Sequence, residues 1–282
     1  MILAHEFTRS NIARDSDFTT HPQERKTTPH DNRQHVLIAQ FASSSAEDFA
    51  RASLLIEPWV DGVNLNCGCP QPWAIKEGIG CQLMEEPARV AEIVRAAKDA
   101  LAPLGKSVSV KIRIAKDLSK TKSWIDAVQE AGVDYITIHG RLKNQRSSTP
   151  PNYEAVRILK EYACVPIVAN GDAYTLRDVK DIAERTGVDG VMAARGMLEN
   201  PAMFAGYDVT PVECVQKFLG FAIRCPIPFA LVLHHVVEMT EKMEGMGKKQ
   251  KRALMECKDL LELIDSIEDR WGCGDEVAVL NA

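Results

Sequence analysis

Short apolar runs alternate with longer amphipathic stretches along most of this chain. The apolar runs are bounded by turn residues, which is typical of buried strands, and they lie at residues 36–41, 62–67, 107–113, 135–140, 166–171 and 190–195. The stretches between them predict helices at residues 43–57, 87–102, 124–131, 153–162 and 175–185. Because strands and helices alternate, we expect a parallel sheet with right-handed crossovers.

Polar side chains recur where these predicted strands end. They are Gln40, Asn66, Cys69, Lys111, His139, Asn170, Asp172 and Arg195. A TIM (β/α)8 barrel gathers such residues at one mouth, whereas an open sheet spreads them along an edge. We favour the barrel, and the lack of a G-x-G-x-x-G motif argues against a Rossmann nucleotide site.

The segment Gly62 to Pro70 carries the clearest candidate chemistry. It begins as a buried strand and ends in Gly-Cys-Pro, which continues neither a helix nor a central strand. The strand end therefore presents an amide, Asn66, and a thiol, Cys69. Taken alone, the segment is equally consistent with a structural turn around buried cysteines, and we expect Cys67 and Cys81 to be structural.

The chain changes character at both ends. Residues 8–35 are polar and predict a loop with at most a short helix, and the tail 272–282 is expected to fray. Beyond Pro211, helices are predicted at 212–223, 229–243 and 248–270. In the last of these, four apolar residues recur at helical spacing and are expected to pack in the core: Leu254, Cys257, Leu261 and Ile264. We therefore predict a barrel domain at 1–208 and a helical domain at 209–282.

The predicted helix 248–270 begins with a basic cluster, formed by Lys248, Lys249, Lys251 and Arg252. Cations at a helix amino end oppose the helix dipole, so a phosphate partner would explain them. The alternative is a solvated run of charge. With a net charge of −5 for 282 residues, RNA binding would need such a local patch.

The composition limits the compartment and the ligands. The eight cysteines show no C-x-x-C pair, so we expect no metal site and reduced thiols. No signal peptide or apolar run of about 20 residues is present, so no membrane span is expected. We predict a monomer in the cytoplasm, with a nuclear pool left open.

Several motifs together resemble the tRNA-dihydrouridine synthase family. They are Asn66-Cys67-Gly68-Cys69-Pro70, Val110-Lys111-Ile112-Arg113, Ile138-His139-Gly140-Arg141, Ala169-Asn170-Gly171-Asp172 and Ala194-Arg195-Gly196. The segments after Cys67 and Asn200 look like the eukaryotic branch that acts at positions 20a and 20b of the tRNA D-loop. The resemblance implies a barrel that holds FMN, reduction by NADPH or NADH, hydride transfer to C6 of a uracil and a proton to C5.

The resemblance also implies roles for single residues. Cys69 matches the family's acid, and an ordinary thiol is protonated at pH 7. The flavin contacts are then Gln40, Lys111, His139, Asn170, Gly171, Asp172, Ala194 and Arg195. The substrate contacts are Asn66, Arg141, Lys248, Lys249, Lys251 and Arg252. For Arg113 and Arg141 two roles remain open: each could be a structural ion-pair partner or a contact to the RNA.

The amino terminus departs from the family pattern. Residues 1–4 look like the end of the family's second strand, so we expect six clear strands, one stub and a truncated barrel in which strands 36–41 and 190–195 border a gap. Weaker FMN binding is the expected consequence. Two alternatives remain: an FMN barrel oxidoreductase of the dihydroorotate dehydrogenase type acting on a free pyrimidine, and a non-catalytic RNA-binding fragment.

Overall fold

A computed structural model describes residues 1–18, 20 and 36–272 of the chain. Its seven parallel strands pair in sequence order. They are β1 (Ile2–Leu3), β2 (Ile38–Ala42), β3 (Gly62–Cys67), β4 (Ser107–Ile114), β5 (Tyr135–Leu142), β6 (Ile167–Asn170) and β7 (Gly190–Met192). The six predicted strands and the predicted stub are confirmed. With a helix after almost every strand, this is a TIM-like α/β barrel fold.

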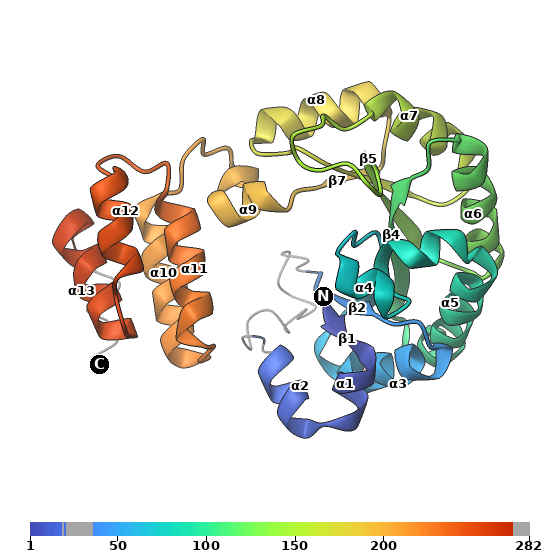
Figure 1. The fold of residues 1–282 in the computed structure, drawn as a ribbon, viewed down its shortest axis with the longest axis horizontal. Coiled ribbons are helices and arrows are strands. Elements are labelled where there is room, and N and C mark those ends of the chain that lie inside the picture. Colours follow the sequence, from blue (N-terminus) through green and yellow to red (C-terminus); the bar gives the residue numbers. More distant parts are fainter. Residues whose placement is uncertain (19, 21–35, 273–282) are drawn as a thin grey trace. The chain divides into compact units, whose positions relative to one another are not determined.

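Helices follow the strands where the amphipathic stretches predict them. They are α3 (Ala46–Ile56), α5 (Pro87–Leu101), α6 (Leu118–Glu130), α7 (Tyr153–Tyr162) and α8 (Leu176–Thr186). Figure 1 shows helices such as α5, α6 and α7 around the outside of the strands. The shorter elements are η1 (Glu57–Trp59), α4 (Pro72–Lys76), η2 (Gly80–Glu85) and η3 (Ala102–Leu104). Side chains cap two of these helices at their amino ends: the Asp48 N–H donates to Ser45 Oγ (3.1 Å), and the Asp178 N–H donates to Thr175 Oγ1 (3.1 Å).

The two faces of β3 differ, and this difference sets up the site. Val63, Leu65 and Cys67 are fully buried on one face. Asn64 and Asn66 alternate with them on the other. The register places Asn66 beside Lys111 of β4, and Lys111 beside Thr137 of β5. One face of the sheet therefore carries a continuous polar row.

One prediction near the amino terminus is confirmed in the described residues and one is wrong. The predicted short helix is α2 (Asn11–Asp17), and it follows α1 (Ala4–Arg9), which was not predicted. Ser10 Oγ caps α2 by accepting from the Ala13 N–H (3.2 Å), and Phe7 packs edge-on against Phe41 with ring centroids 5.2 Å apart. Residues 19 and 21–35 of the predicted loop, and residues 273–282 of the predicted frayed tail, lie outside the described residues.

The wrong prediction concerns the border of the sheet. Ile2 of β1 is in register with Phe41 of β2, so the strand near 36–41 has a neighbour on both sides. The terminal strands of the described sheet are β1 and β7. β7 is also shorter than predicted, because Arg195 already begins the helix α9 (Arg195–Glu199).

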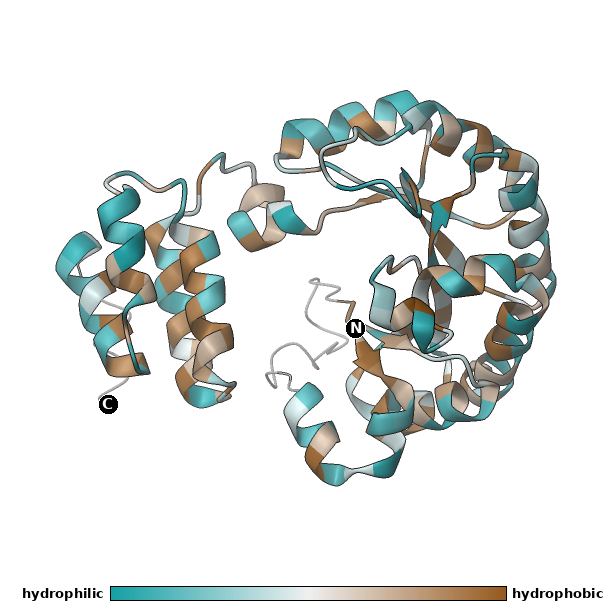
Figure 2. Ribbon diagram, in the orientation of Figure 1, coloured by the Kyte–Doolittle hydropathy of each residue, from teal (hydrophilic) through white to brown (hydrophobic). Residues whose placement is uncertain are grey.

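By its internal contacts the chain divides into two units, residues 1–171 with 181–192, and residues 172–180 with 193–282. The division predicted near residue 208 remains a prediction. The second unit holds α9, η4 (Met203–Ala205), α10 (Val212–Arg224), α11 (Phe229–Thr240), α12 (Lys248–Met255) and α13 (Leu260–Trp271). Apolar stripes on α10 to α13 form a separate core around Val215, Val236 and Leu254 (Figure 2).

The predicted helices 212–223 and 229–243 are confirmed, but 248–270 is two helices. Asp259 breaks the pattern, because its carboxylate caps α13 by accepting from the Glu262 N–H (3.0 Å). Because of this break, the helical spacing of the apolar residues does not continue from α12 into α13. Leu254 is buried as predicted, whereas Leu261 is 73% exposed, so its predicted core position is wrong.

No helix in the described ranges is both long enough and apolar enough to span a bilayer. Nor do three or more His, Cys, Asp or Glu side chains in those ranges gather in a way that could hold a metal ion.

Candidate active site

Three side-chain amides from neighbouring strands form a hydrogen-bonded ladder on the polar face. Gln40 donates to Asn64 Oδ1 (2.8 Å) and accepts from Asn66 Nδ2 (2.9 Å). Asn64 in turn donates to Ser109 Oγ (2.9 Å). Because each amide fixes the next, the ladder sets which way the oxygen and nitrogen of each side chain point.

Asn66 also shapes the turn that carries the thiol. Its Oδ1 accepts from the backbone N–H groups of Gly68 (3.1 Å) and Cys69 (2.9 Å). The Cys69 carbonyl accepts from the Cys81 N–H (2.9 Å), which joins the turn to η2. One amide therefore couples the ladder to the position of Cys69.

The three cysteines near this turn have different environments. Cys67 is completely buried, and burial, with a smaller contribution from Cys81, raises the pKa of its thiol. Burial likewise raises the pKa of Cys81 to about 11. Both fit the predicted structural role, since a buried thiol with a raised pKa is unreactive. Cys69 is partly exposed and presents the available thiol.

Lys111 lies beside Asn66 on β4. Burial, and secondarily the charge of Arg113, lowers its pKa from 10.5 to about 8. Within the described residues its amine makes no hydrogen bond or ion pair. Next to it in the register, the buried hydroxyl of Thr137 also lacks a partner among those residues. A desolvated cation beside an unused hydroxyl is an arrangement that suits an anionic or strongly polar ligand.

Arg113 holds two loops together. Its Nε donates to the Gly68 carbonyl (3.1 Å), and its Nη1 donates to the carbonyls of Leu142 (2.9 Å) and Gln145 (2.9 Å). These bonds give Arg113 a structural role through carbonyls and not through an ion pair, and the RNA contact considered for it stays a prediction. Its positioning role was not predicted, although its place two residues after Lys111 on the same face was a usable signal.

Arg141 and His139 form a second positioning pair. Arg141 is 2% exposed, and it donates to the carbonyls of Ser147 (3.1 Å) and Thr149. Its Nη1 lies 3.1 Å from Nε2 of His139. Because a guanidinium only donates, Nε2 accepts in this pair, so Nδ1 carries the proton. The substrate contact predicted for Arg141 stays a prediction.

Asn170 and Gly171 end β6 in the first unit. Asn170 donates to the Met192 carbonyl (2.8 Å), and Tyr153 Oη donates to the Gly171 carbonyl (2.8 Å). Gly171 has φ +132°, and a Cβ there would lie 2.8 Å from Pro151. Both the backbone angle and the close contact with Pro151 therefore require glycine at this position.

The remaining predicted phosphate contacts lie together in the second unit. Arg195 pairs with Asp172 (3.0 Å) and stands over the ring of Tyr174, 5.2 Å from its centroid. Asp172 has a left-handed backbone (φ +46°), which is uncommon outside glycine. Ala194 is the N-cap residue of α9, and its backbone angles (φ −128°, ψ −85°) lie outside the helical and extended regions. These residues keep their predicted roles as predictions.

The basic cluster begins α12 and is exposed over most of its length. Two of its members have acidic neighbours: Lys251 pairs with Glu241 (2.6 Å) and Arg252 with Glu256 (2.9 Å). Lys248 and Lys249 form no ion pair with any residue in the described ranges. The cluster is thus half neutralised, and its first two residues carry the free charge.

Fold and site together define a class of protein, a parallel α/β barrel whose strand ends carry a thiol, amides and a desolvated lysine. The model of the dihydrouridine synthase (Dus) family matches residues 2–270. The chain belongs to the dihydrouridine synthase family.

Several relatives carry the name tRNA-dihydrouridine(20a/20b) synthase, with NAD(P)+ as part of the name. The Schizosaccharomyces pombe protein is 40% identical over 273 residues, which are 96% of this chain and 78% of that protein. The Homo sapiens protein, named as 20a/20b-synthase-like, is 36% identical over 96% of this chain and 82% of its own length. The Saccharomyces cerevisiae protein is 38% identical over 98% of this chain and 76% of its length.

Proposed function

We propose that this chain is a flavin-dependent tRNA-dihydrouridine synthase, which reduces the C5–C6 bond of D-loop uridines at positions 20a and 20b with NAD(P)H. The observation that carries the proposal is the juxtaposition of Asn66 and Lys111 on one sheet face, with Cys69 fixed by Asn66. Relatives at 36–40% identity supply the substrate and the reductant by their names.

The residues of the site fit FMN. Lys111 is a desolvated amine without an anionic partner in the described chain, and reduced flavin would supply a negative charge near it. Gln40 and His139 would hold the ring system. Phosphate and ribityl contacts would come from Asn170, Gly171, Asp172, Ala194 and Arg195. The chemistry that FMN supplies is hydride transfer from NAD(P)H to C6 of the uracil.

The chain's own residues then complete the reduction. Asn66 orients the uracil ring, because its amide is held by Gln40 and by the turn. Cys69 gives its thiol proton to C5 as negative charge develops there. The hydride at C6 and the proton at C5 together saturate the bond, and the thiolate recovers its proton from solvent.

The tRNA partner accounts for the remaining predicted residues. We assign the basic cluster of α12 and Arg141 to contacts with the RNA, and we place the enzyme as a monomer in the cytoplasm with a possible nuclear fraction left open. A local patch suffices for this, since phosphate contacts give affinity without requiring a basic protein overall.

The test uses the purified full chain and tRNA transcribed without modification. We expect a flavin absorption spectrum and NAD(P)H-dependent formation of dihydrouridine at positions 20a and 20b, mapped by mass spectrometry. Reduction of free uracil, or oxidation of dihydroorotate, without reduction of tRNA would indicate the alternative oxidoreductase. Binding of tRNA without flavin or product would indicate a non-catalytic RNA-binding protein.

A further inference from the structure

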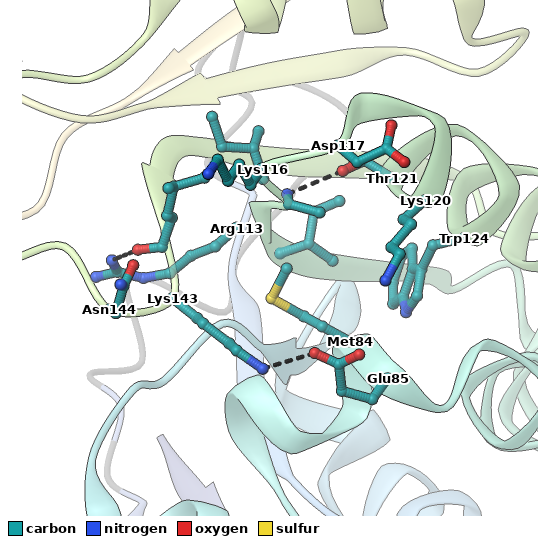
Figure 3. Close-up of a pocket in the computed structure, with 14 residues that line it drawn as sticks. Met84, Glu85, Arg113, Lys116, Asp117, Lys120, Thr121, Trp124, Lys143 and Asn144 are labelled. Atoms are coloured by element: carbon teal, nitrogen blue, oxygen red, sulfur yellow. Dashed lines mark hydrogen bonds and ion pairs between the residues drawn. The ribbon is translucent and has the colours of Figure 1, made fainter.

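A pocket of about 610 Å³ lies in the first unit beside the polar face but separate from the ladder. Its walls come from the ends of β4 and β5, from η2 and from the start of α6 (Figure 3). The volume is in the range of small-molecule sites. Cys69, Lys111 and His139 do not line it, so the roles proposed above leave this pocket unused.

The lining combines an apolar floor with a cationic rim. The floor is formed by Met84, Ile112, Ile114, Trp124 and Leu142. Four cationic and two acidic side chains also line the pocket: Arg113, Lys116, Lys120, Lys143, Glu85 and Asp117. An apolar floor accepts a planar ring, and an excess of cations at the rim accepts a phosphate.

The cations at the rim differ in what already binds them. Lys143 pairs with Glu85 (2.6 Å), and Arg113 is committed to three carbonyls. Lys116 and Lys120 are exposed and form neither an ion pair nor a side-chain hydrogen bond with another described residue. Lys120 is in the first turn of the 13-residue helix α6, whose amino end is capped by Asp117 Oδ1, which accepts from the Ser119 N–H (3.0 Å).

Arg113 connects this pocket to the candidate active site. It lines the pocket, and its Nε donates to the Gly68 carbonyl in the turn that carries Cys69. A ligand that contacts Arg113 in the pocket is therefore one side chain away from the turn. We expect an extended molecule with two rings and phosphates between them to reach from the pocket toward the candidate active site.

We propose that this pocket binds the adenine nucleotide half of NAD(P)H, with the adenine on the apolar floor and phosphate on Lys116 and Lys120. The inference rests on the proposed function, since it requires a dinucleotide reductant. Single-stranded RNA, by contrast, binds along open grooves that take successive bases. This pocket has the volume for one nucleotide, so the reductant is the better occupant.

The test measures binding directly on the full chain. NADPH binding is followed by its fluorescence, and 2′,5′-ADP is titrated by calorimetry. The variant Lys116→Glu/Lys120→Glu should raise the Kd for both probes at least about tenfold, since a lost charge-assisted hydrogen bond costs roughly that factor. The matched control is Lys122→Glu on the same helix, whose amine stands 4.8 Å from the Tyr162 ring centroid and outside the pocket. We expect the control to bind both probes like the wild type.

A second variant tests the floor without changing charge. The larger side chain of Met84→Trp should fill the pocket and weaken the binding of 2′,5′-ADP, while the affinity for tRNA stays unchanged. Unchanged Kd values in the Lys116→Glu/Lys120→Glu variant, or a loss of tRNA affinity with NADPH binding intact, would overturn the proposal. If the wild type binds NADPH through these lysines but forms no dihydrouridine, the proposed function fails while the pocket assignment stands.

Discussion

At the scale of single residues, position decides what a side chain can do. Cys67 and Cys69 are two residues apart, but β3 ends at Cys67 and the turn redirects the chain. Cys67 therefore faces the core, where burial raises the pKa of its thiol. Cys69 is held at the partly exposed end of the strand by Asn66. Only the second thiol is placed to deliver a proton.

The first prediction separates these two thiols. Cys69→Ala should retain flavin but slow uridine reduction by about 10²–10⁴-fold, because the proton donor at C5 is removed while the contacts to the cofactor remain. Single-turnover reduction of tRNA with pre-reduced enzyme measures this. The control Cys67→Ala should lower the melting temperature and leave the rate close to wild type. A Cys69→Ala enzyme with the wild-type single-turnover rate would exclude this thiol as the acid.

The second prediction concerns Lys111 and pH. Its pKa is about 8 in the folded chain and 10.5 when unperturbed, so between these values the unfolded chain binds more protons at this site. Stability should therefore rise from pH 8 to 10.5, and below pH 8 the full cost of burying the charge remains. Lys111→Met should be more stable than the wild type at pH 7 in the flavin-free protein, with the difference shrinking toward pH 10.5.

Urea unfolding of both proteins at pH 7, 9 and 10.5 provides the measurement for Lys111. Lys180→Met, on the exposed side of α8, serves as the control and should not change the pH dependence. Parallel curves for the wild type and Lys111→Met would contradict the assignment of the lowered pKa to a buried charge.

At the scale of elements, the regular part of the fold could be predicted because each strand and helix carries its own periodicity. The ladder could be predicted only in part. Gln40 and Asn66 could be selected from the sequence because they are polar residues where predicted strands end. The hydrogen bonds through Asn64 could not, because they depend on the register between strands. The error over residues 248–270 has a similar cause, because the break before α13 depends on the Asp259 cap. Single side-chain bonds of this kind leave little trace in hydropathy.

The third prediction tests the joint between the turn and η2. Gly80 has φ +62°, and a Cβ there would lie 2.5 Å from the Cys69 carbonyl oxygen. Gly80→Ala should therefore displace the turn, lowering both stability and the rate of tRNA reduction. Gly105→Ala is the matched control, because its φ is +70° and a Cβ there meets nothing within 4 Å. It should cost about 1 kcal/mol in the free energy of unfolding, from backbone strain alone, without loss of rate. Equal losses in both variants would mean that the turn tolerates the added Cβ.

At the scale of the whole molecule, the distribution of charge matters more than its sum. A chain with a net charge of −5 must bind a polyanion through local excess of positive charge. In the second unit this excess is concentrated at the start of α12, because Glu241 and Glu256 offset Lys251 and Arg252. The helices α10 to α13 form their own core, so substitutions at the exposed start of α12 leave that core intact.

The last prediction follows from this uneven pairing. Lys248→Gln/Lys249→Gln should weaken tRNA binding and lower the slope of log Kd against log salt by about two units, one for each lost phosphate contact. Lys251→Gln/Arg252→Gln removes the same formal charge from residues that already have acidic partners, so its effect should be smaller. Filter binding at several salt concentrations measures both slopes, with melting curves to confirm that each variant is folded. Unchanged slopes in both variants would show that the basic cluster is only solvated, and a larger effect of the second pair would show that tRNA displaces Glu241 and Glu256 from their partners.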